Sequence, residues 1–146
     1  MMQYLLCRWH DEAFALDTRE VLELLRMVQI TRLPSEAGRM DGLLNYRGEV
    51  IPVMDACRMF RRDPVGYDAD SLIAVMRHQG QGVAVVAHEL IDLYEIEENQ
   101  LKIHDADGNE AFDASLSLDG RLYPVLNIGR LQRDAVAGLQ QMAATV

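Results

Sequence analysis

The sequence predicts a mainly β protein built from two small barrels packed side by side, with short helices and a C-terminal helix. The segment 44–55 recurs as 116–127 with Leu, Gly, Pro and Val at the same places, so that Gly120 follows Gly48 by 72 residues. The segment 14–24 has a counterpart in 83–93, displaced by 69 residues. Short apolar segments separated by turn residues, present twice, indicate a duplicated β unit of about seventy residues.

Alternating apolar residues and turn-forming residues define the strands of the first copy. Residues 10–12 form a polar turn, and Pro34 ends the third strand. Arg47 and Gly48 are expected to form a tight hairpin turn, because glycine adopts the positive φ that such a turn needs. The expected strands are 4–9, 13–17, 30–33, 43–46 and 50–54, with a short helix from Asp17 or Thr18 to about Leu25.

The second copy carries the stronger hairpin signal, Asp119 followed by Gly120. Pro52 and Pro124 fall inside strands, and proline cannot donate a backbone hydrogen bond, so we expect an edge or a bulge there. The expected elements are strands 72–77, 83–87, 115–118 and 121–126, a turn at 80–82, a short helix over 89–96 and an amphipathic helix from Ile128 to the C-terminus.

The 146 residues are expected to form one domain with two lobes. The first barrel is placed at 1–62, the second at 69–127 and the C-terminal helix at 128–146, with a polar linker over 61–68. Because each lobe alone is small, we expect the two to share a hydrophobic seam, which would also create a groove for a partner.

Composition excludes some classes of protein. The chain has 14 Lys and Arg against 23 Asp and Glu, a net charge of −9 and no basic run, which argues against a nucleic-acid partner. Cys7 and Cys57 lie in apolar segments and are expected to be buried and reduced. No signal peptide or apolar stretch long enough to insert in a membrane is visible, so a cytoplasmic protein is expected.

Motifs for chemistry are poorly supported. Residues 105–109 resemble the start of a calcium loop, but Gly108 and Leu116 fall where that loop does not allow them, so an ordinary polar loop is expected. The four histidines lack metal-ligand spacing, and His104 and Asp105 point apart on an extended chain. There is no phosphate-binding loop or nucleophile elbow, and we expect no metal, no cofactor and no enzymatic activity.

The two copies differ in their charges. The first has Arg47 at its hairpin tip and Glu23 upstream, whereas Asp119 and Asp92 stand there in the second. Such charges are either solvated surface groups or part of a recognition site. An arginine beside glycine at a turn can present its planar donors to carboxylates or carbonyls of a partner.

At these residues the chain resembles the CheW chemotaxis coupling protein family, whose hallmark is Asn-Leu-Arg-Gly, three residues, Pro, two residues and Asp. Here the run is Asn45-Tyr46-Arg47-Gly48, then Pro52 and Asp55. The resemblance implies two SH3-like five-stranded barrels and a non-catalytic adaptor. Such an adaptor links the cytoplasmic tip of a chemoreceptor to the regulatory domain of a CheA-type histidine kinase, at membrane-associated receptor arrays.

The resemblance also implies roles for single residues. Glu23 and Arg47 would bind the receptor, with Val21, Leu43 and Asn45 shaping the groove. A chiefly apolar kinase contact is expected, and its candidate residues are equally consistent with positions in the core. These candidates are Val28, Ile30, Leu33 and Met40, and the residues expected to be structural are Gly48, Pro52, Asp55, Gly120 and Pro124.

The chain departs from the family pattern at Tyr46, where Leu is common, and at Asn127, where Asp is frequent. These departures bear on which receptor and kinase are served, and flagellar chemotaxis and pilus or surface-sensing pathways both remain open. The alternatives are a small-barrel module that binds nucleic acid or another protein, and an enzyme on a doubled barrel. The net charge of −9 argues against nucleic acid, and no catalytic site supports an enzyme.

Overall fold

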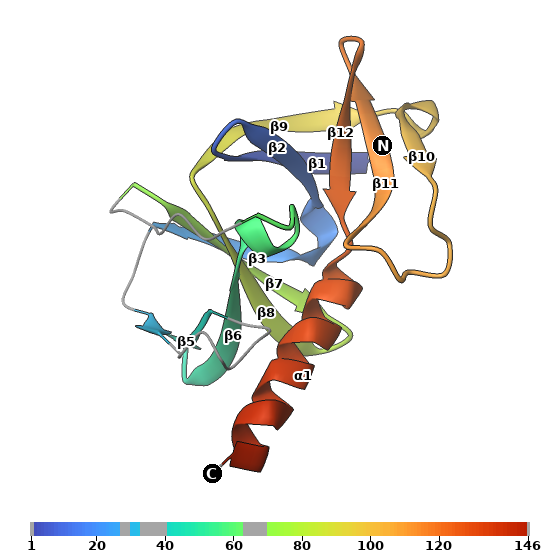
Figure 1. The fold of residues 1–146 in the computed structure, drawn as a ribbon. Coiled ribbons are helices and arrows are strands. Elements are labelled where there is room, and N and C mark those ends of the chain that lie inside the picture. The colour runs from blue at the N-terminus through green and yellow to red at the C-terminus, as the bar shows by residue number, and fades with distance from the viewer. Residues whose placement is uncertain (1, 27–29, 33–40, 63–69, 146) are drawn as a thin grey trace.

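The computed structural model describes residues 2–26, 30–32, 41–62 and 70–145. Within this part of the chain, β-strands form two sheets, and one α-helix follows the last strand (Figure 1). The strands are β1 (Met2–Trp9), β2 (Glu12–Asp17), β3 (Val21–Arg26), β4 (Thr31–Arg32), β5 (Gly42–Tyr46), β6 (Glu49–Asp55), β7 (Leu72–His78), β8 (Gln81–Ala87), β9 (Glu89–Ile96), β10 (Leu101–Ile103), β11 (Phe112–Leu118) and β12 (Arg121–Leu126). The helices are α1 (Ile128–Thr145) and 3-10 turns at Thr18–Glu20, Ala56–Arg58 and Glu98–Gln100.

The duplication is visible in the order of the strands. The central sheet has the order β3-β7-β8-β6-β5-β4, and the terminal sheet, made from the two ends of the chain, has the order β9-β1-β2-β12-β11-β10. The first copy contains β1 to β6 and the second copy β7 to β12. When the strands are numbered from one to six within each copy, both sheets have the order 3-1-2-6-5-4. Each sheet also contains one parallel pair at equivalent residues, Val53 with Ala84 and Val125 with Ala15. The predicted repeat is therefore confirmed at the level of topology.

The two sheets do not coincide with the expected lobes 1–62 and 69–127. The β1–β2 hairpin of the first copy joins β9 to β12 of the second, and the β7–β8 hairpin of the second copy joins β3 to β6 of the first. Each sheet thus contains five longer strands and one very short strand, β4 with 2 residues or β10 with 3. The copies have exchanged their first hairpins within one chain.

The expected hydrophobic seam is present between the sheets. Strands β1 and β2 have both faces covered, with Cys7 and Phe14 in the shared seam and Leu6 and Ala15 inside the terminal sheet. A third cluster fills the central sheet. The seam is built from Leu5, Cys7, Trp9, Phe14, Leu16, Met54, Ala56, Cys57, Ala74, Met76, Val83, Val85, Ala87, Leu126, Ile128, Leu131 and Ala135.

Both short helices expected after the second strand of each copy are wrong over most of their length. The Asp17 carboxylate caps only one 3-10 turn, accepting from the backbone N–H of Arg19 at 3.0 Å, and β3 then pairs with β7. In the second copy β9 pairs with β1 along its length, apart from a bulge at Ile91. Pairing with a distant strand satisfies the backbone of these segments, and this outweighs the local cap signal.

Smaller differences concern turns and prolines. The β7–β8 turn lies at Gln79 and Gly80, one residue before the expected position, with φ of +50° and +82°. Pro52 and Pro124 lie in interior strands and not at a sheet edge. Each proline directly precedes the residue at which parallel pairing begins, Val53 or Val125. The N–H that proline lacks is therefore not needed by the parallel hydrogen-bond ladder.

The C-terminal helix is confirmed. Asn127 caps α1 by accepting the backbone N–H of Arg130 at 3.1 Å, and Leu131 and Ala135 are buried against the seam. Helix α1 packs on β6, β7 and β8. In the described part of the chain, no helix has the length and apolar character needed to cross a membrane.

Candidate protein-binding site

The β5–β6 hairpin tip presents Arg47 to solvent. Arg47 and Gly48 form the two-residue turn, with φ of +52° and +85°, and the side-chain oxygen of Asn45 accepts the N–H of Gly48 at 3.1 Å. Left-handed values at both turn residues match the twist of the flanking strands. The Arg47 side chain projects from this tip and is 76% exposed.

Glu23 of β3 pairs with the hairpin tip across the sheet. Its Oε1 accepts from Nη2 of Arg47 at 3.0 Å and from the hydroxyl of Tyr46 at 2.8 Å. Strand β3 is one edge of the central sheet and β5 lies next to the other edge, so this contact requires the sheet to curl into a barrel. A bulge in β3 leaves Leu22 unpaired beside Glu23, and Leu22 is 48% exposed.

A second ion pair lies beside the first. Nη2 of Arg77 on β7 is 2.7 Å from Oε2 of Glu49 on β6. Strand β8 runs between them. Its residue Gly82 lies close to Glu49 and Ile51, and a Cβ added to Gly82 would be only 3.0 Å from the Ile51 side chain. The two pairs border an open basin of about 370 Å³, lined by Leu22, Tyr46, Arg47, Glu49 and Arg77.

The hydrogen bond to Glu23 raises the pKa of the Tyr46 phenol above its ordinary value. The cause is that only the neutral phenol can donate to the carboxylate, and partial desolvation acts in the same direction while Arg47 opposes it. Tyr46 therefore remains a donor to Glu23 throughout the neutral pH range.

The equivalent end of the terminal sheet lacks this arrangement. Asp119 occupies the tip at φ +49°, followed by Gly120 at +79°, and Asp92 accepts the backbone N–H of Leu93. Two carboxylates cannot form an ion pair, and Leu118 stands where Tyr46 stands in the central sheet. Among the described residues, the basin with its paired charges thus lies at the end of the central sheet and has no counterpart at the equivalent end of the terminal sheet.

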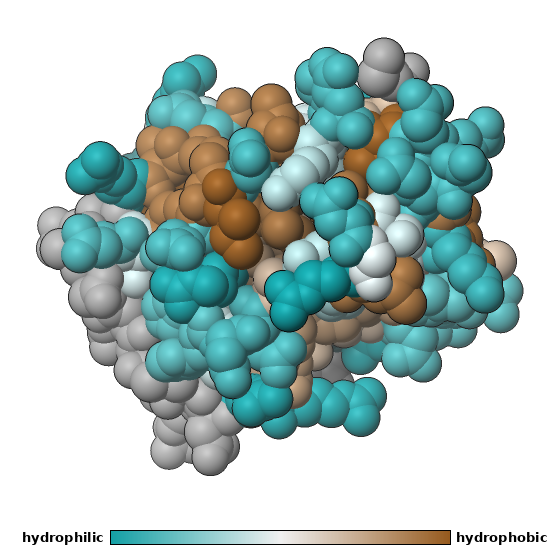
Figure 2. Space-filling view, turned by 90° about the horizontal axis from the view of Figure 1, so that it is seen from above, coloured by the Kyte–Doolittle hydropathy of each residue, from teal (hydrophilic) through white to brown (hydrophobic). Residues whose placement is uncertain are grey.

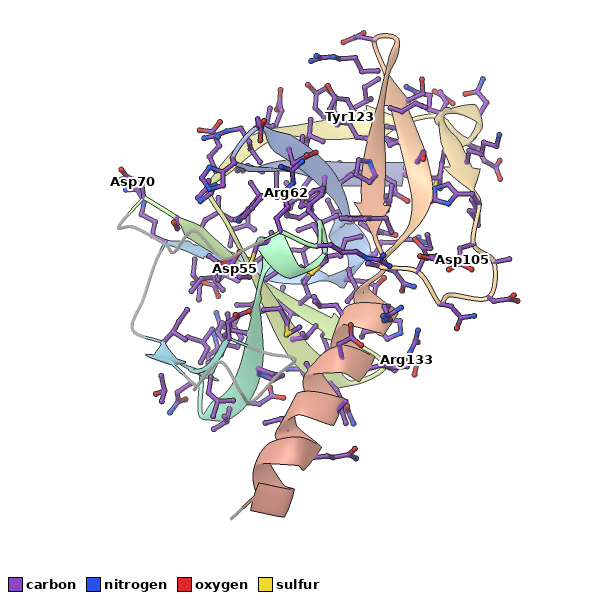
Figure 3. All side chains as sticks on the ribbon, viewed as in Figure 1. Asp55, Arg62, Asp70, Asp105, Tyr123 and Arg133 are labelled. Atoms are coloured by element: carbon purple, nitrogen blue, oxygen red, sulfur yellow. The ribbon has the colours of Figure 1, made fainter. Side chains whose placement is uncertain are left out.

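Asp55, expected to be structural, links the two sheets. It is 3% exposed, and its Oδ1 accepts from the indole N–H of Trp9 and from the backbone N–H of Cys57, both at 3.0 Å. Figure 3 shows Asp55 where the two sheets meet. Asp55 ends β6 of the central sheet and its carboxylate accepts from Trp9 at the end of β1, so it ties the terminal sheet to the central one.

Comparison with known proteins gives the family. The model of the CheW-like domain matches residues 3–136. This chain belongs to the CheW-like domain family. Its two-sheet architecture is also that of a solved structure, the scaffolding protein TtCheW from Thermoanaerobacter tengcongensis, with a TM-score of 0.73, 23% identity, and coverage of 86% of this chain and 88% of that one.

Two curated chemotaxis proteins CheW are similar in sequence. The protein of Thermotoga maritima is 25% identical over 126 residues, which cover 83% of this chain and 81% of the relative. The protein of Klebsiella aerogenes is 23% identical over 100 residues, which cover 68% of this chain and 60% of the relative. The family resemblance of the hairpin motif is therefore confirmed.

The remaining residues expected at a receptor site of this CheW-like chain differ in exposure. Val21 and Leu43 are half-buried and pack against the inter-sheet seam, whereas Asn45 is exposed beside the tip. Of the kinase candidates, Ile30 is half-buried against the core of the central sheet. The other three lie outside the described residues: Val28, Leu33 and Met40.

Sequence reasoning missed an apolar surface on β9. Leu90, Ile91 and Leu93 are 39%, 43% and 50% exposed on this edge strand. Figure 2 looks onto the end of the molecule where β9 lies and shows brown apolar surface bordered by teal side chains. This surface was missed because residues 89–96 were expected to form a helix. The repeat did offer a signal, because Ile91 is equivalent to Leu22, and both are bulge residues with exposed side chains.

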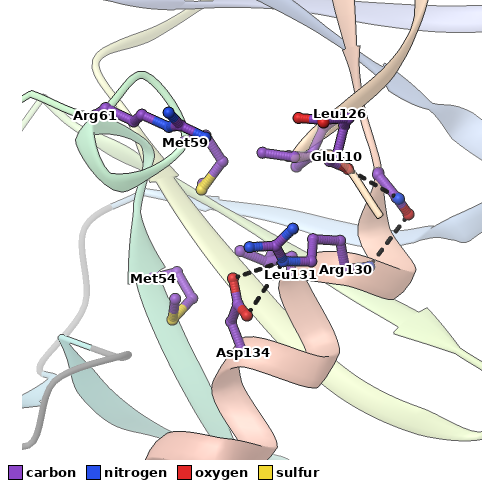
Figure 4. Close-up of a pocket in the computed structure, with 10 residues that line it drawn as sticks. Met54, Met59, Arg61, Glu110, Leu126, Arg130, Leu131 and Asp134 are labelled. Atoms are coloured by element: carbon purple, nitrogen blue, oxygen red, sulfur yellow. Dashed lines mark hydrogen bonds and ion pairs between the residues drawn. The ribbon is translucent and has the colours of Figure 1, made fainter. Parts of the chain in front are cut away.

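A small pocket of about 90 Å³ lies at the junction of the two sheets with α1 (Figure 4). Its wall includes Met54 and Leu131, and its rim carries the ion pair of Arg130 with Asp134. Within the described residues no group of three His, Cys, Asp or Glu side chains is arranged to hold a metal. Asp105, from the loop that resembles a calcium site, accepts the backbone N–H of Glu110.

Two histidines beside hairpin turns make contacts with segments that cross between the sheets. Nδ1 of His78 lies 2.6 Å from Oε2 of Glu20. The backbone N–H of His10 donates to Nδ1 of His88 at 2.7 Å, and Nε2 of His10 is buried. The first contact joins the β7–β8 hairpin to the segment that crosses from β2 to β3, and the second joins the β1–β2 turn to the segment that crosses from β8 to β9. Because both segments pass from one sheet to the other, these contacts indicate a structural role.

Proposed function

We propose that this CheW-like protein is a non-catalytic adaptor that couples the cytoplasmic tips of chemoreceptors to a CheA-type histidine kinase. The observation that carries the proposal is the Glu23–Arg47 pair beside the exposed Leu22 in an open basin. A guanidinium with free donors next to an apolar side chain suits a helical hairpin that presents both carboxylates and apolar groups. Val21, Leu43 and Asn45 complete the proposed receptor site.

The kinase contact is proposed to be chiefly apolar. One candidate is the segment that contains Val28, Ile30, Leu33 and Met40. The other is the β9 surface formed by Leu90, Ile91 and Leu93, which the fold leaves exposed on an edge strand. Exposed apolar side chains on an edge strand are typical of a surface that a partner covers.

The cellular setting follows from these partners. A receptor tip and a kinase regulatory domain meet in the cytoplasm, so we propose that the protein resides there, at membrane-associated receptor arrays. The protein is proposed to act by binding alone, without cofactor or nucleic acid. A fluorescent fusion that clusters with receptors, and disperses when the receptors are deleted, would support this location.

The decisive experiment is titration of the purified chain against two fragments from the same genome, a receptor signalling-tip hairpin and the kinase regulatory domain. The adaptor proposal expects each fragment to bind alone and both to bind together. Failure of the chain to bind any receptor tip or kinase domain of its own genome would refute it.

The two kinase surfaces are separated by matched substitutions. Ile91→Asp is expected to weaken kinase binding at least tenfold while the circular dichroism spectrum stays unchanged, because Ile91 is already 43% exposed. Ile30→Asp is expected to destabilise the fold because its side chain packs on the central core. Kinase binding unaffected by Ile91→Asp would place the contact away from β9.

A further inference from the structure

Tyr46 connects the hairpin tip to the far edge of the central sheet. Its ring packs against the core of that sheet, and its hydroxyl donates to Oε1 of Glu23 at 2.8 Å. Strands β5 and β3 are not neighbours in the sheet, so this hydrogen bond spans the open side of the barrel. One side chain is thereby anchored in the core and bonded at the surface.

The same tyrosine also contacts the arginine of the pair. The guanidinium carbon of Arg47 lies 5.1 Å from the centroid of the Tyr46 ring, in cation–π geometry. Nη2 of Arg47 donates to the Glu23 oxygen that Tyr46 also bonds. An exposed ion pair on its own restrains its side chains weakly. Here the ring and the hydroxyl restrain both partners at once.

This arrangement belongs to one copy only. Its counterpart, Leu118, has neither a hydroxyl nor a ring, and the neighbouring charges there are both acidic. Among the contacts of the described residues, only Nη2 of Arg47 is engaged in the pair, so most of the guanidinium donors face solvent. Restraint of a long side chain before binding reduces the entropy lost when a partner is bound.

We propose that Tyr46 is a specificity-determining positioning residue, which holds Glu23 and Arg47 in one arrangement so that the basin favours a partner carboxylate over a neutral amide. The inference rests on the proposed function, because the partner is the receptor tip. It concerns selectivity and leaves the identity of the kinase contact untouched. The raised pKa of the Tyr46 phenol has this same hydrogen bond to Glu23 as its main cause, so it offers a way to follow the contact in solution.

The test uses two versions of one two-helix receptor-tip fragment, the natural one and one with its tip glutamates changed to glutamine. The wild-type chain is expected to prefer the natural fragment at least tenfold. Tyr46→Phe keeps the ring but removes the hydroxyl, and it should reduce that preference to about threefold or less. Tyr123→Phe is the matched control, since Tyr123 is a half-buried tyrosine of the terminal sheet and should leave the preference unchanged.

Glu23→Gln provides a second variant with the tyrosine intact. It should reduce the preference as Tyr46→Phe does, and NMR titration should show the Tyr46 pKa falling towards its ordinary value. A purely structural role for Tyr46 would lower stability without changing the ratio of the two affinities. An unchanged ratio in Tyr46→Phe, or no preference in the wild type, overturns the inference while receptor binding still stands. A wild-type chain that binds neither fragment overturns the proposed function and this inference with it.

Discussion

Reversing the charge at the two hairpin tips tests whether recognition uses one copy only. Arg47→Glu places a carboxylate beside Glu23, at a site where the guanidinium lies 3.0 Å from it. Asp119→Arg makes the opposite change at the equivalent tip. Arg at position 119 is compatible with the backbone, because the protein already holds Arg47 at φ +52° in the equivalent turn. An acidic side chain, that of Asp119, likewise occupies φ +49°.

The magnitudes follow from exposure. The Arg47 side chain is 76% exposed and that of Glu23 35%, so loss of the pair is expected to cost about 0.2–1 kcal/mol of folding free energy. Two carboxylates about 4 Å apart in water repel by about 1 kcal/mol, and this sets a similar scale. At a desolvated contact with a receptor, removal of one charged partner costs about 2–5 kcal/mol of binding free energy.

The expected result is therefore unequal. Arg47→Glu should weaken binding to a receptor-tip fragment at least about tenfold, which is about 1.4 kcal/mol, while Asp119→Arg leaves it nearly unchanged. Isothermal titration measures both affinities, and circular dichroism confirms that both variants are folded. Equal losses from the two variants, or no loss from Arg47→Glu, would mean that the difference in charge between the copies carries no recognition.

Three further predictions concern the fold. Asp55→Ala leaves the N–H groups of Trp9 and Cys57 without their acceptor, so it should lower the free energy of unfolding by about 2–4 kcal/mol. Urea unfolding followed by Trp9 fluorescence measures this loss, and a loss below about 0.5 kcal/mol would contradict the linking role of Asp55. Gly48→Ala and Gly120→Ala should each cost about 1 kcal/mol, and equally, because both glycines have positive φ and open space around them; clearly unequal costs would argue against equivalent turns. Burial raises the pKa of the Cys7 thiol to about 12, so this thiol should resist a thiol reagent at pH 8 until the protein unfolds. The free energy of unfolding should fall above about pH 9, because only the thiol of the unfolded chain ionises there. Rapid labelling of the native protein would refute this prediction.

Local patterns predicted the hairpins correctly because their signals are local. Arg47-Gly48 and Asp119-Gly120 form the expected turns, since a two-residue turn depends on residues that can adopt positive φ. The segments after Asp17 and His88 were predicted wrongly as helices. Each has helix-compatible residues, but each forms a strand because β7 or β1 offers it a partner. The paired residues are 46 to 55 positions apart for β3 and more than eighty apart for β9, so no short window of sequence contains both partners.

The candidate site was predictable in part for the same reason. The charges of Glu23 and Arg47 drew notice because the second copy lacks them, and the structure brings the two together at 3.0 Å. The role of Tyr46 was not predictable, because its hydroxyl reaches Glu23 only when the sheet curls and brings β3 near β5. The exposure of Leu90, Ile91 and Leu93 likewise depends on β9 being an edge strand.

The exchange of hairpins between the copies explains why the lobe boundaries could not be read from the sequence. If each copy kept its own first hairpin, every local pattern and every displacement of 69 or 72 residues would be the same as in the exchanged arrangement. Only the strand pairs at the borders of the exchanged hairpins distinguish the two. These are the parallel pairs β2–β12 and β6–β8 and the antiparallel pairs β1–β9 and β3–β7. Each pair links a strand of one copy to a strand of the other, so neither half of the chain contains a complete sheet. The basin at the hairpin tip depends on this exchange, because Arg77 of the second copy lines it beside Arg47 of the first.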